Sequence, residues 1–83
     1  GSELYPNPSD GNFNIRFNLE KAQKVRFEIN DMNGRRVALL LDTYIKAGKN
    51  EFTFSTQPLT SGNYILQIST SEKILASQKL TVK

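Results

Sequence analysis

Apolar and polar side chains alternate along most of this chain, and this two-residue period is the feature that most constrains its fold. Neighbouring residues of a strand point to opposite faces, so each alternating run predicts a strand with one buried face. Aromatic and β-branched residues supply many of the apolar positions, which is typical of strands packed on one side. The alternating runs lie at residues 13–19, 25–29, 52–55, 64–69 and 79–83.

Turn-forming residues separate these runs. Asn33-Gly34 supplies the positive φ angles that a two-residue hairpin needs, and Gly11, Gly48 and Gly62 lie in similar segments. Six or seven short strands joined by such turns predict an all-β fold, an antiparallel immunoglobulin-like β-sandwich. A chain of 83 residues has room for one core, so we expect a single domain over residues 3–83, with Gly1-Ser2 as the remnant of a cleaved affinity tag.

Residues 37–45 fit two patterns. A helix is suggested by the spacing of Val37, Leu40, Leu41, Tyr44 and Ile45. A strand is suggested by Val37, Leu39 and Leu41, which would share its inward face. The strand is favoured, because the hairpin signal at Asn33-Gly34 calls for an antiparallel partner directly after it.

The chain has no cysteine and no histidine, which removes disulfides, the common zinc and haem ligands, and the usual nucleophile pairs. The remaining candidates for acid–base chemistry are Asp10, Asp31 and Asp42, and their positions near turns favour a structural role. Residues 31–34 resemble the start of a calcium loop, but Leu40 stands where that loop needs a glutamate. No cofactor, metal site or enzymatic activity is expected.

Charges are interspersed, with 11 Lys and Arg against 8 Asp and Glu. Arg16 and Arg26 could lie side by side on adjacent strands, but the aromatic residues occupy inward positions, so a solvated face is favoured over a nucleic-acid partner. Tyr5 and Tyr44 are the plausible exposed aromatics, and they keep an adhesive or carbohydrate-binding module as an alternative. The longest apolar run, Val37 to Leu41, is too short for a transmembrane helix.

The opening of the chain contains Pro6 and Pro8 with Asn7 between them. Proline lacks a backbone donor and is excluded from the middle of a central strand. The segment is therefore predicted to be a stiff lead-in to the first strand, and to keep that edge from pairing with another sheet.

Several motifs, taken in order, resemble the type A C-terminal sorting domain of type IX secretion cargo from Bacteroidota. They are Leu-Tyr-Pro-Asn-Pro at residues 4–8, the hairpin over residues 25–37, the turn at residues 47–50, residues 59–64 and residues 79–83. A related family, the Ig-like domain of flagellar hook-capping proteins, usually carries Trp-Asp after the aromatic strand. Here Phe54-Ser55-Thr56-Gln57 stands in that place, which favours the sorting domain.

The resemblance implies a set of sorting-motif residues. They are Tyr5, Pro6, Asn7 and Pro8 in the opening, Asp31, Asn33 and Gly34 in the hairpin, Gly48 in a turn, Gly62 and Tyr64 in the penultimate strand, and Lys79, Leu80, Val82 and Lys83 in the last. The glycines suit turns and the apolar members suit a core face, so most of the set is interpreted as structural. The terminal segment and the exposed lysines are expected to contact the machinery, with the free edge of the final strand open to β-augmentation.

The resemblance also implies a role. The domain would be a non-catalytic signal at the end of a covalently linked N-terminal cargo, exported to the periplasm and then carried by the type IX translocon to the cell surface or medium. A sortase-like peptidase would cleave upstream of Tyr5 and release the cargo or join it to an anionic lipopolysaccharide. The ending Lys-x-x-x-Lys resembles the family's natural C-terminus. A purely structural spacer is the other alternative.

Overall fold

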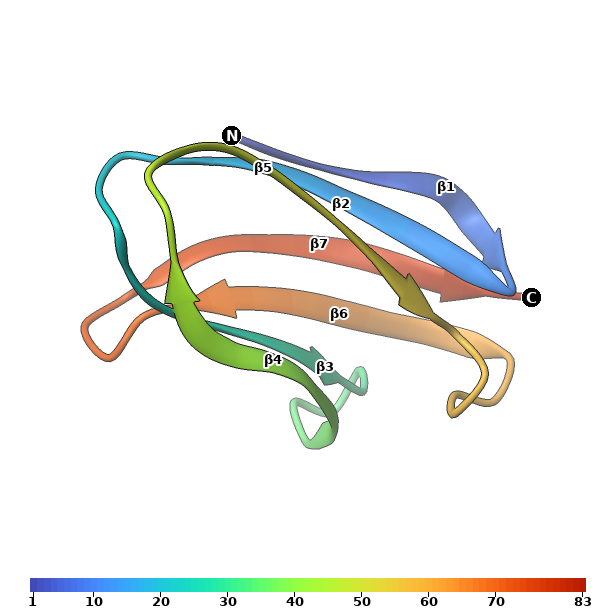
Figure 1. Cartoon of the computed structure of the whole chain (residues 1–83). Coiled ribbons are helices and arrows are strands. Elements are labelled where there is room, and N and C mark those ends of the chain that lie inside the picture. Colours follow the sequence, from blue (N-terminus) through green and yellow to red (C-terminus); the bar gives the residue numbers. More distant parts are fainter.

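The computed structural model describes residues 1–83, whose regular structure consists of seven β-strands. Figure 1 shows how they are arranged. The strands are β1 (Ser2–Asp10), β2 (Asn12–Leu19), β3 (Gln23–Asn30), β4 (Arg36–Ile45), β5 (Gly48–Ser55), β6 (Gly62–Ser69) and β7 (Ile74–Val82). The predicted all-β fold is confirmed, and residues 37–45 belong to a strand. The structure has no helix with the length and hydropathy needed to cross a bilayer.

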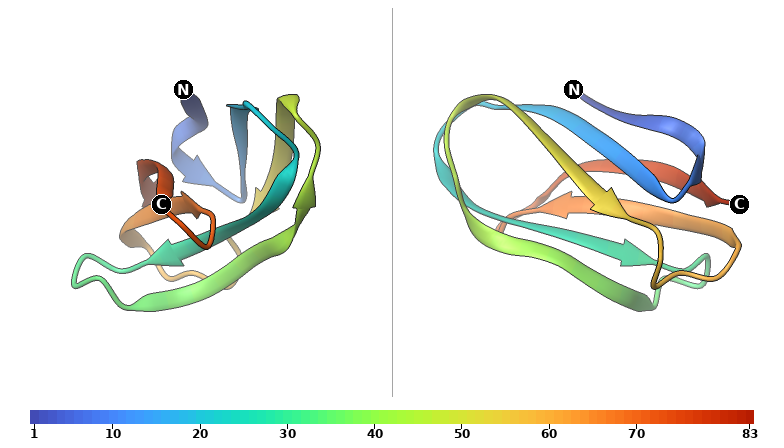
Figure 2. Two further views of the ribbon diagram at one scale, coloured as in Figure 1. Left: turned by 90° about the vertical axis from the view of Figure 1, so that its left-hand side faces the viewer. Right: turned by 45° about the vertical axis from the view of Figure 1, so that its right-hand side comes forward.

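The strands form two layers, which the left view of Figure 2 shows one above the other. The first sheet has the order β1-β2-β5 and the second has the order β4-β3-β6-β7. All neighbours within each sheet are antiparallel. This arrangement is the predicted immunoglobulin-like sandwich.

The connection from β2 to β3 crosses from one sheet to the other, so consecutive strands are not neighbours here. Arg16 on β2 and Arg26 on β3 therefore lie on different sheets, and the expectation that they lie side by side is wrong. Arg16 forms ion pairs with Glu3 and Glu51, whereas Arg26 pairs with Asp42 at 3.5 Å.

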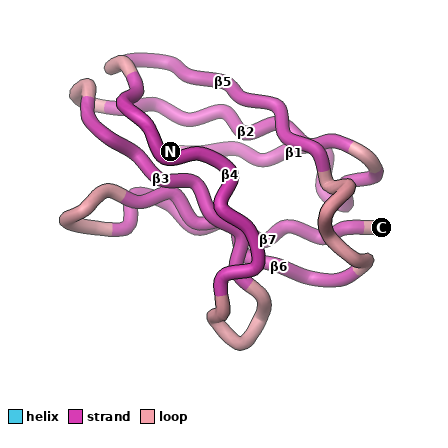
Figure 3. Tube along the Cα trace, turned by 60° about the horizontal axis from the view of Figure 1, so that its bottom comes forward, coloured by secondary structure: helices cyan, strands magenta, loops and turns pink.

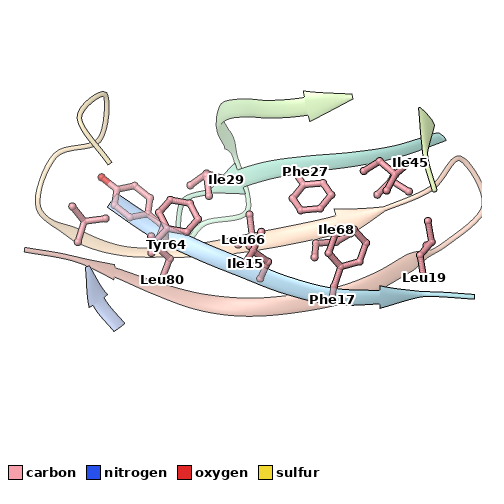
Figure 4. Close-up of a cluster of buried hydrophobic side chains, with 13 residues drawn as sticks. Ile15, Phe17, Leu19, Phe27, Ile29, Ile45, Tyr64, Leu66, Ile68 and Leu80 are labelled. Carbon is pink, nitrogen blue, oxygen red and sulfur yellow. The ribbon is translucent and has the colours of Figure 1, made fainter. Parts of the chain in front are cut away.

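The core lies between the sheets and is built from the alternating apolar positions (Figure 4). Rings from both sheets meet there: the centroid of Phe27 on β3 lies 5.2 Å from that of Phe17 on β2 and 5.6 Å from that of Phe52 on β5. The inward assignment of the alternating runs is confirmed. The buried apolar residues are Phe13, Ile15, Phe17, Leu19, Val25, Phe27, Ile29, Ile45, Tyr64, Leu66, Ile68, Leu80 and Val82.

The apolar side chains of β4 do not all point inward, contrary to what the sequence pattern suggests. Val37 and Leu39 are 46% and 48% exposed, while Leu41 packs against the core. The pairing of β3 with β4 contains two register shifts, and each inserts an extra residue into β4. An extra residue reverses the alternation of side chains, so the three do not share one face.

Strand β1 changes sheets along its length. Residues 2–5 pair with β2, whereas Ser9 pairs in parallel with Val82 of β7. Pro6 to Pro8 lie between these two segments and take no part in either ladder, since proline cannot donate a hydrogen bond. The prolines therefore lie within β1 and between two neighbouring strands, and the prediction of a lead-in that protects a sheet edge is wrong.

Candidate functional site

The opening motif and the terminal strand are joined by one side chain. The Asn7 amide nitrogen donates to the backbone oxygen of Lys79 at 2.9 Å, and the Asn7 amide oxygen accepts from the backbone N–H of Thr81, also at 2.9 Å. A carboxamide carries the same donor and acceptor groups as a peptide unit. Asn7 thus replaces the ladder contacts that the flanking prolines cannot make.

Ser9 completes the junction between β1 and β7. Its side chain is fully buried, and its hydroxyl donates to the backbone oxygen of Pro6 at 2.5 Å. Its own backbone oxygen accepts from the N–H of Lys83 at 3.0 Å. We call Pro6–Ser9 together with Lys79–Lys83 the β1–β7 seam.

The start of β6 supports the seam from the other side of β7. Gly62 pairs with Val82, and Tyr64 pairs with Leu80. The hydroxyl of Tyr64 donates to the backbone oxygen of Thr60 at 2.6 Å. This is the tyrosine corner of immunoglobulin-like sandwiches, in which a tyrosine near the start of the sixth strand bonds back to the preceding connection. Figure 4 shows Tyr64 and Leu80 close together in the core.

The other predicted site residues lie in turns. Asp31, Asn33 and Gly34 form the β3–β4 turn, where Gly34 has a φ of 87°. The carboxylate of Asp31 accepts the backbone N–H groups of Arg35 and Asn33, and these bonds, the one from Arg35 most, lower the pKa of Asp31. Gly48 lies at the other end of the sandwich, opposite Leu19, with a φ of 99°.

The terminal strand does not present a free edge at the seam. From Lys79 onward β7 has β6 on one side and β1 on the other, so the prediction of an open edge for β-augmentation there is wrong. The outer edges of β4 and β5 are unpaired along their whole length, and residues 2–5 of β1 and 74–78 of β7 each lack a strand partner on one side. The seam exposes positive charge instead. The side chains of Lys79 and Lys83 are exposed, and neither forms an ion pair, since all five ion pairs of the chain are made by arginine.

Tyr5 ties β1 to the far strand of the first sheet. Its hydroxyl donates to the carboxylate of Glu51 on β5 and accepts from Arg16 on β2 at 3.1 Å. The Arg16 guanidinium carbon also lies 5.3 Å from the centroid of the Tyr5 ring. The hydrogen bond to Glu51 raises the pKa of Tyr5. With Tyr44 on β4 of the second sheet, the two tyrosines do not form a common platform for a sugar.

Sequence reasoning missed Ser9, Arg16 and Glu51 as partners of the opening motif. The signal for Arg16 and Glu51 was present in the alternation, since both occupy outward positions on strands that prove to be neighbours. The carboxylate of Asp42, one of the three acid–base candidates, forms an ion pair with Arg26. No group of three acidic side chains in the structure is arranged to hold a metal ion.

Comparison with known families places the whole chain in one family. The sequence model of the family described as secretion system C-terminal sorting domain matches residues 3–83, which include the whole seam. A search of curated proteins finds no match. This match covers nearly the full chain. The chain therefore belongs to the secretion system C-terminal sorting domains, the sorting signals of type IX secretion.

Proposed function

We propose that residues 3–83 form one non-catalytic domain that directs an upstream cargo across the outer membrane and is recognised in its folded state. Family membership supports the sorting role. The observation that supports recognition of the fold is the bonding of Asn7 to Lys79 and Thr81, since more than 70 residues separate these motifs in the sequence and only folding brings them together.

The proposed route passes through the periplasm to the type IX translocon, followed by removal of the domain by a sortase-like peptidase upstream of Tyr5. The direction of β1 supports this order of parts. Because β1 and β7 run in parallel, the start of β1 lies at the end of the sandwich opposite the end of β7 (Figure 1). A cargo joined before β1 would leave Lys79–Lys83 uncovered while it is still attached.

Lys79 and Lys83 are the proposed contacts for the machinery within the seam. Both side chains are exposed and neither forms an ion pair, so both are available to a carboxylate on a partner. Leu80 and Val82 are buried beside them and hold this segment in the sheet. The lysines can therefore be substituted without disturbing the core. Removal of Lys79–Lys83 would also remove two core residues, Leu80 and Val82.

The test is a periplasm-directed fluorescent reporter fused before residues 3–83 in a bacterium with a working type IX system. We expect fluorescence at the surface or in the medium, and retention in the periplasm of a translocon-null host. A Lys79→Gln, Lys83→Gln double variant should be retained more than wild type. Lys24→Gln, Lys73→Gln is the matched control, because both lysines are exposed, form no ion pair and lie outside the seam. Deletion of residues 79–83 serves only as the unfolded reference, because it removes Leu80 and Val82 from the core.

Equal retention of the reporter in both hosts would contradict the sorting role and would return attention to a spacer or a glycan-binding module. Secretion of the Lys79 and Lys83 double variant at the wild-type level would leave the sorting role intact and remove these two lysines from the contact surface. A glycan array with the isolated domain separates the spacer from the glycan-binding module.

A further inference from the structure

Strand β5 ends the first sheet with a complete and unpaired edge. Its eight residues pair with β2 from Gly48 to Ser55 without a register shift, and no strand lies on its other side. Figure 3 shows β5 at the rim of the molecule. A regular edge of this length is a template for the addition of another strand.

The hydrogen-bonding groups of this edge can be assigned. The N–H of Thr56 donates to Gly11 on the inner side, and backbone groups of a strand alternate in direction. It follows that the N–H and C=O groups of four residues point away from β2: Lys49, Glu51, Thr53 and Ser55. The Lys46 ammonium, which donates to the backbone oxygen of Lys49 at 3.3 Å, reaches this same edge.

The other candidate edge is poorly suited to strand addition. Strand β4 contains two register shifts against β3, at Phe27/Glu28 and at Ile29/Asn30. Bulges bend and twist a strand and interrupt its ladder, which is how sheets protect their edges. The seam covers the end of β7. The first half of β7 is shorter than β5 and has a register shift against β6, and the Gln78 side chain bonds to Ser2 at the start of β1. The β5 edge is therefore the longest regular open edge.

The side chains along β5 define what an added strand must carry. Phe52 and Phe54 point inward and pack against the core, yet both are only half-buried. Lys46 and Lys49 lie at the start of the strand without an ion pair, whereas Ser55 at its end is uncharged. A complementary strand would cover the two rings with apolar side chains and place an acidic residue opposite Lys49.

We propose that the β5 edge binds an extended segment of the export machinery by antiparallel strand addition, with alternating apolar residues and an acidic C-terminal end. This inference rests on the sorting role proposed above. Cross-strand pairs with Phe52 and Phe54 would supply packing, and the four outward backbone positions would supply the hydrogen bonds. An antiparallel strand brings its C-terminal end to the start of β5, so the acidic residue that faces Lys49 belongs at the C-terminal end of the segment.

The probe is a fluorescent heptapeptide that alternates threonine with valine and ends in glutamate, measured by fluorescence anisotropy against the wild-type domain. Thr53→Pro removes an outward N–H while leaving the β2 ladder intact, and we expect about tenfold weaker binding. Thr53→Ala is the matched control, because both changes remove the bond from the Thr53 hydroxyl to Asn14 but only proline removes the N–H. Thr53→Ala should bind within about twofold of wild type.

A second arm does not depend on the folding of the proline variant. A heptapeptide ending in lysine should bind the wild type about threefold more weakly, and Lys49→Glu should reverse the order of the two peptides. Amide NMR shifts on binding should centre on Lys49, Glu51, Thr53 and Ser55. Absence of binding, shifts centred on β4 or β7, or equal binding by the Thr53→Pro and Thr53→Ala variants would overturn the β5 site.

The reporter assay separates this inference from the sorting role. If Thr53→Pro is secreted like Thr53→Ala while wild type is sorted, the machinery does not use the β5 edge and the sorting role stands. If wild type itself is not sorted, the sorting role fails, and with it the assignment of the partner to the export machinery. Loss of secretion in Thr53→Pro alone supports the proposal.

Discussion

The Asn7 side chain keeps β1 bonded to β7 through the Pro-x-Pro segment, where β1 passes from one sheet to the other. Pro6 and Pro8 cannot donate to a ladder, and the chain leaves β2 where they begin. The Asn7 side chain bonds to the two β7 backbone groups that would otherwise have no partner on this side. At the residue scale, the opening motif of this sorting domain is thus a device that attaches β1 to the terminal strand.

Asn7→Ala should lower the free energy of unfolding by about 1–3 kcal/mol, because two hydrogen bonds to the backbone are lost. Urea unfolding followed by circular dichroism measures the change. Asn63→Ala is the matched control: its amide oxygen accepts one bond, from the Thr81 hydroxyl at 2.9 Å, so about half the loss is expected. Equal losses in the two variants would contradict the role assigned to Asn7.

At the scale of elements, the β3–β4 hairpin owes its turn to one carboxylate. Asp31 accepts the backbone N–H groups of Asn33 and Arg35 at 2.9 and 3.0 Å, and its carboxylate lies 3.4 Å from the Arg35 side chain. These contacts favour the charged form and hold the pKa of Asp31 below its usual value. A group whose pKa is lowered by folding stabilises the fold above its unfolded pKa.

The stability that Asp31 supplies should therefore be lost as the pH falls below about 4. Wild type should be more stable than Asp31→Asn at neutral pH, and the difference should shrink as the carboxylate of the folded state is protonated. Urea midpoints between pH 7 and pH 2 measure this. Asp10→Asn, at an exposed position without an ion pair, should change the neutral-pH stability by no more than about 0.5 kcal/mol. A constant wild-type advantage over Asp31→Asn at every pH would contradict the account.

The elements also show what the sequence could predict. The strands and their inward faces followed from local alternation, as with Phe27 and Ile29, because side-chain direction depends only on the strand itself. The facing of Leu39 could not be predicted, since bulges arise from pairing with another strand. The motif residues are predicted by resemblance alone, whereas the contact of Asn7 with β7 can be seen only once the neighbouring strands are known.

At the scale of the molecule, the ring of Phe27 lies at the centre of the contacts between the two sheets. Phe27 of the second sheet contacts Phe17, Phe52 and Phe54 of the first, with ring centroids between 5.2 and 5.9 Å apart. Its side chain is fully buried. Phe27→Ala should lower the free energy of unfolding by about 3–5 kcal/mol, and urea unfolding should show it. Tyr44→Ala, at a position 72% exposed, should cost no more than about 0.5 kcal/mol.

The most direct test of recognition in the folded state is the secretion of the reporter carrying Phe27→Ala, compared with Tyr44→Ala. Both variants leave every sorting-motif residue in place, and only the first removes core packing. We predict that the Tyr44 variant reaches the surface or medium like wild type, and that the Phe27 variant stays in the periplasm as intact fusion protein. Wild-type secretion of a Phe27→Ala domain that circular dichroism shows to be unfolded would contradict the account, because the signal would then be a linear sequence.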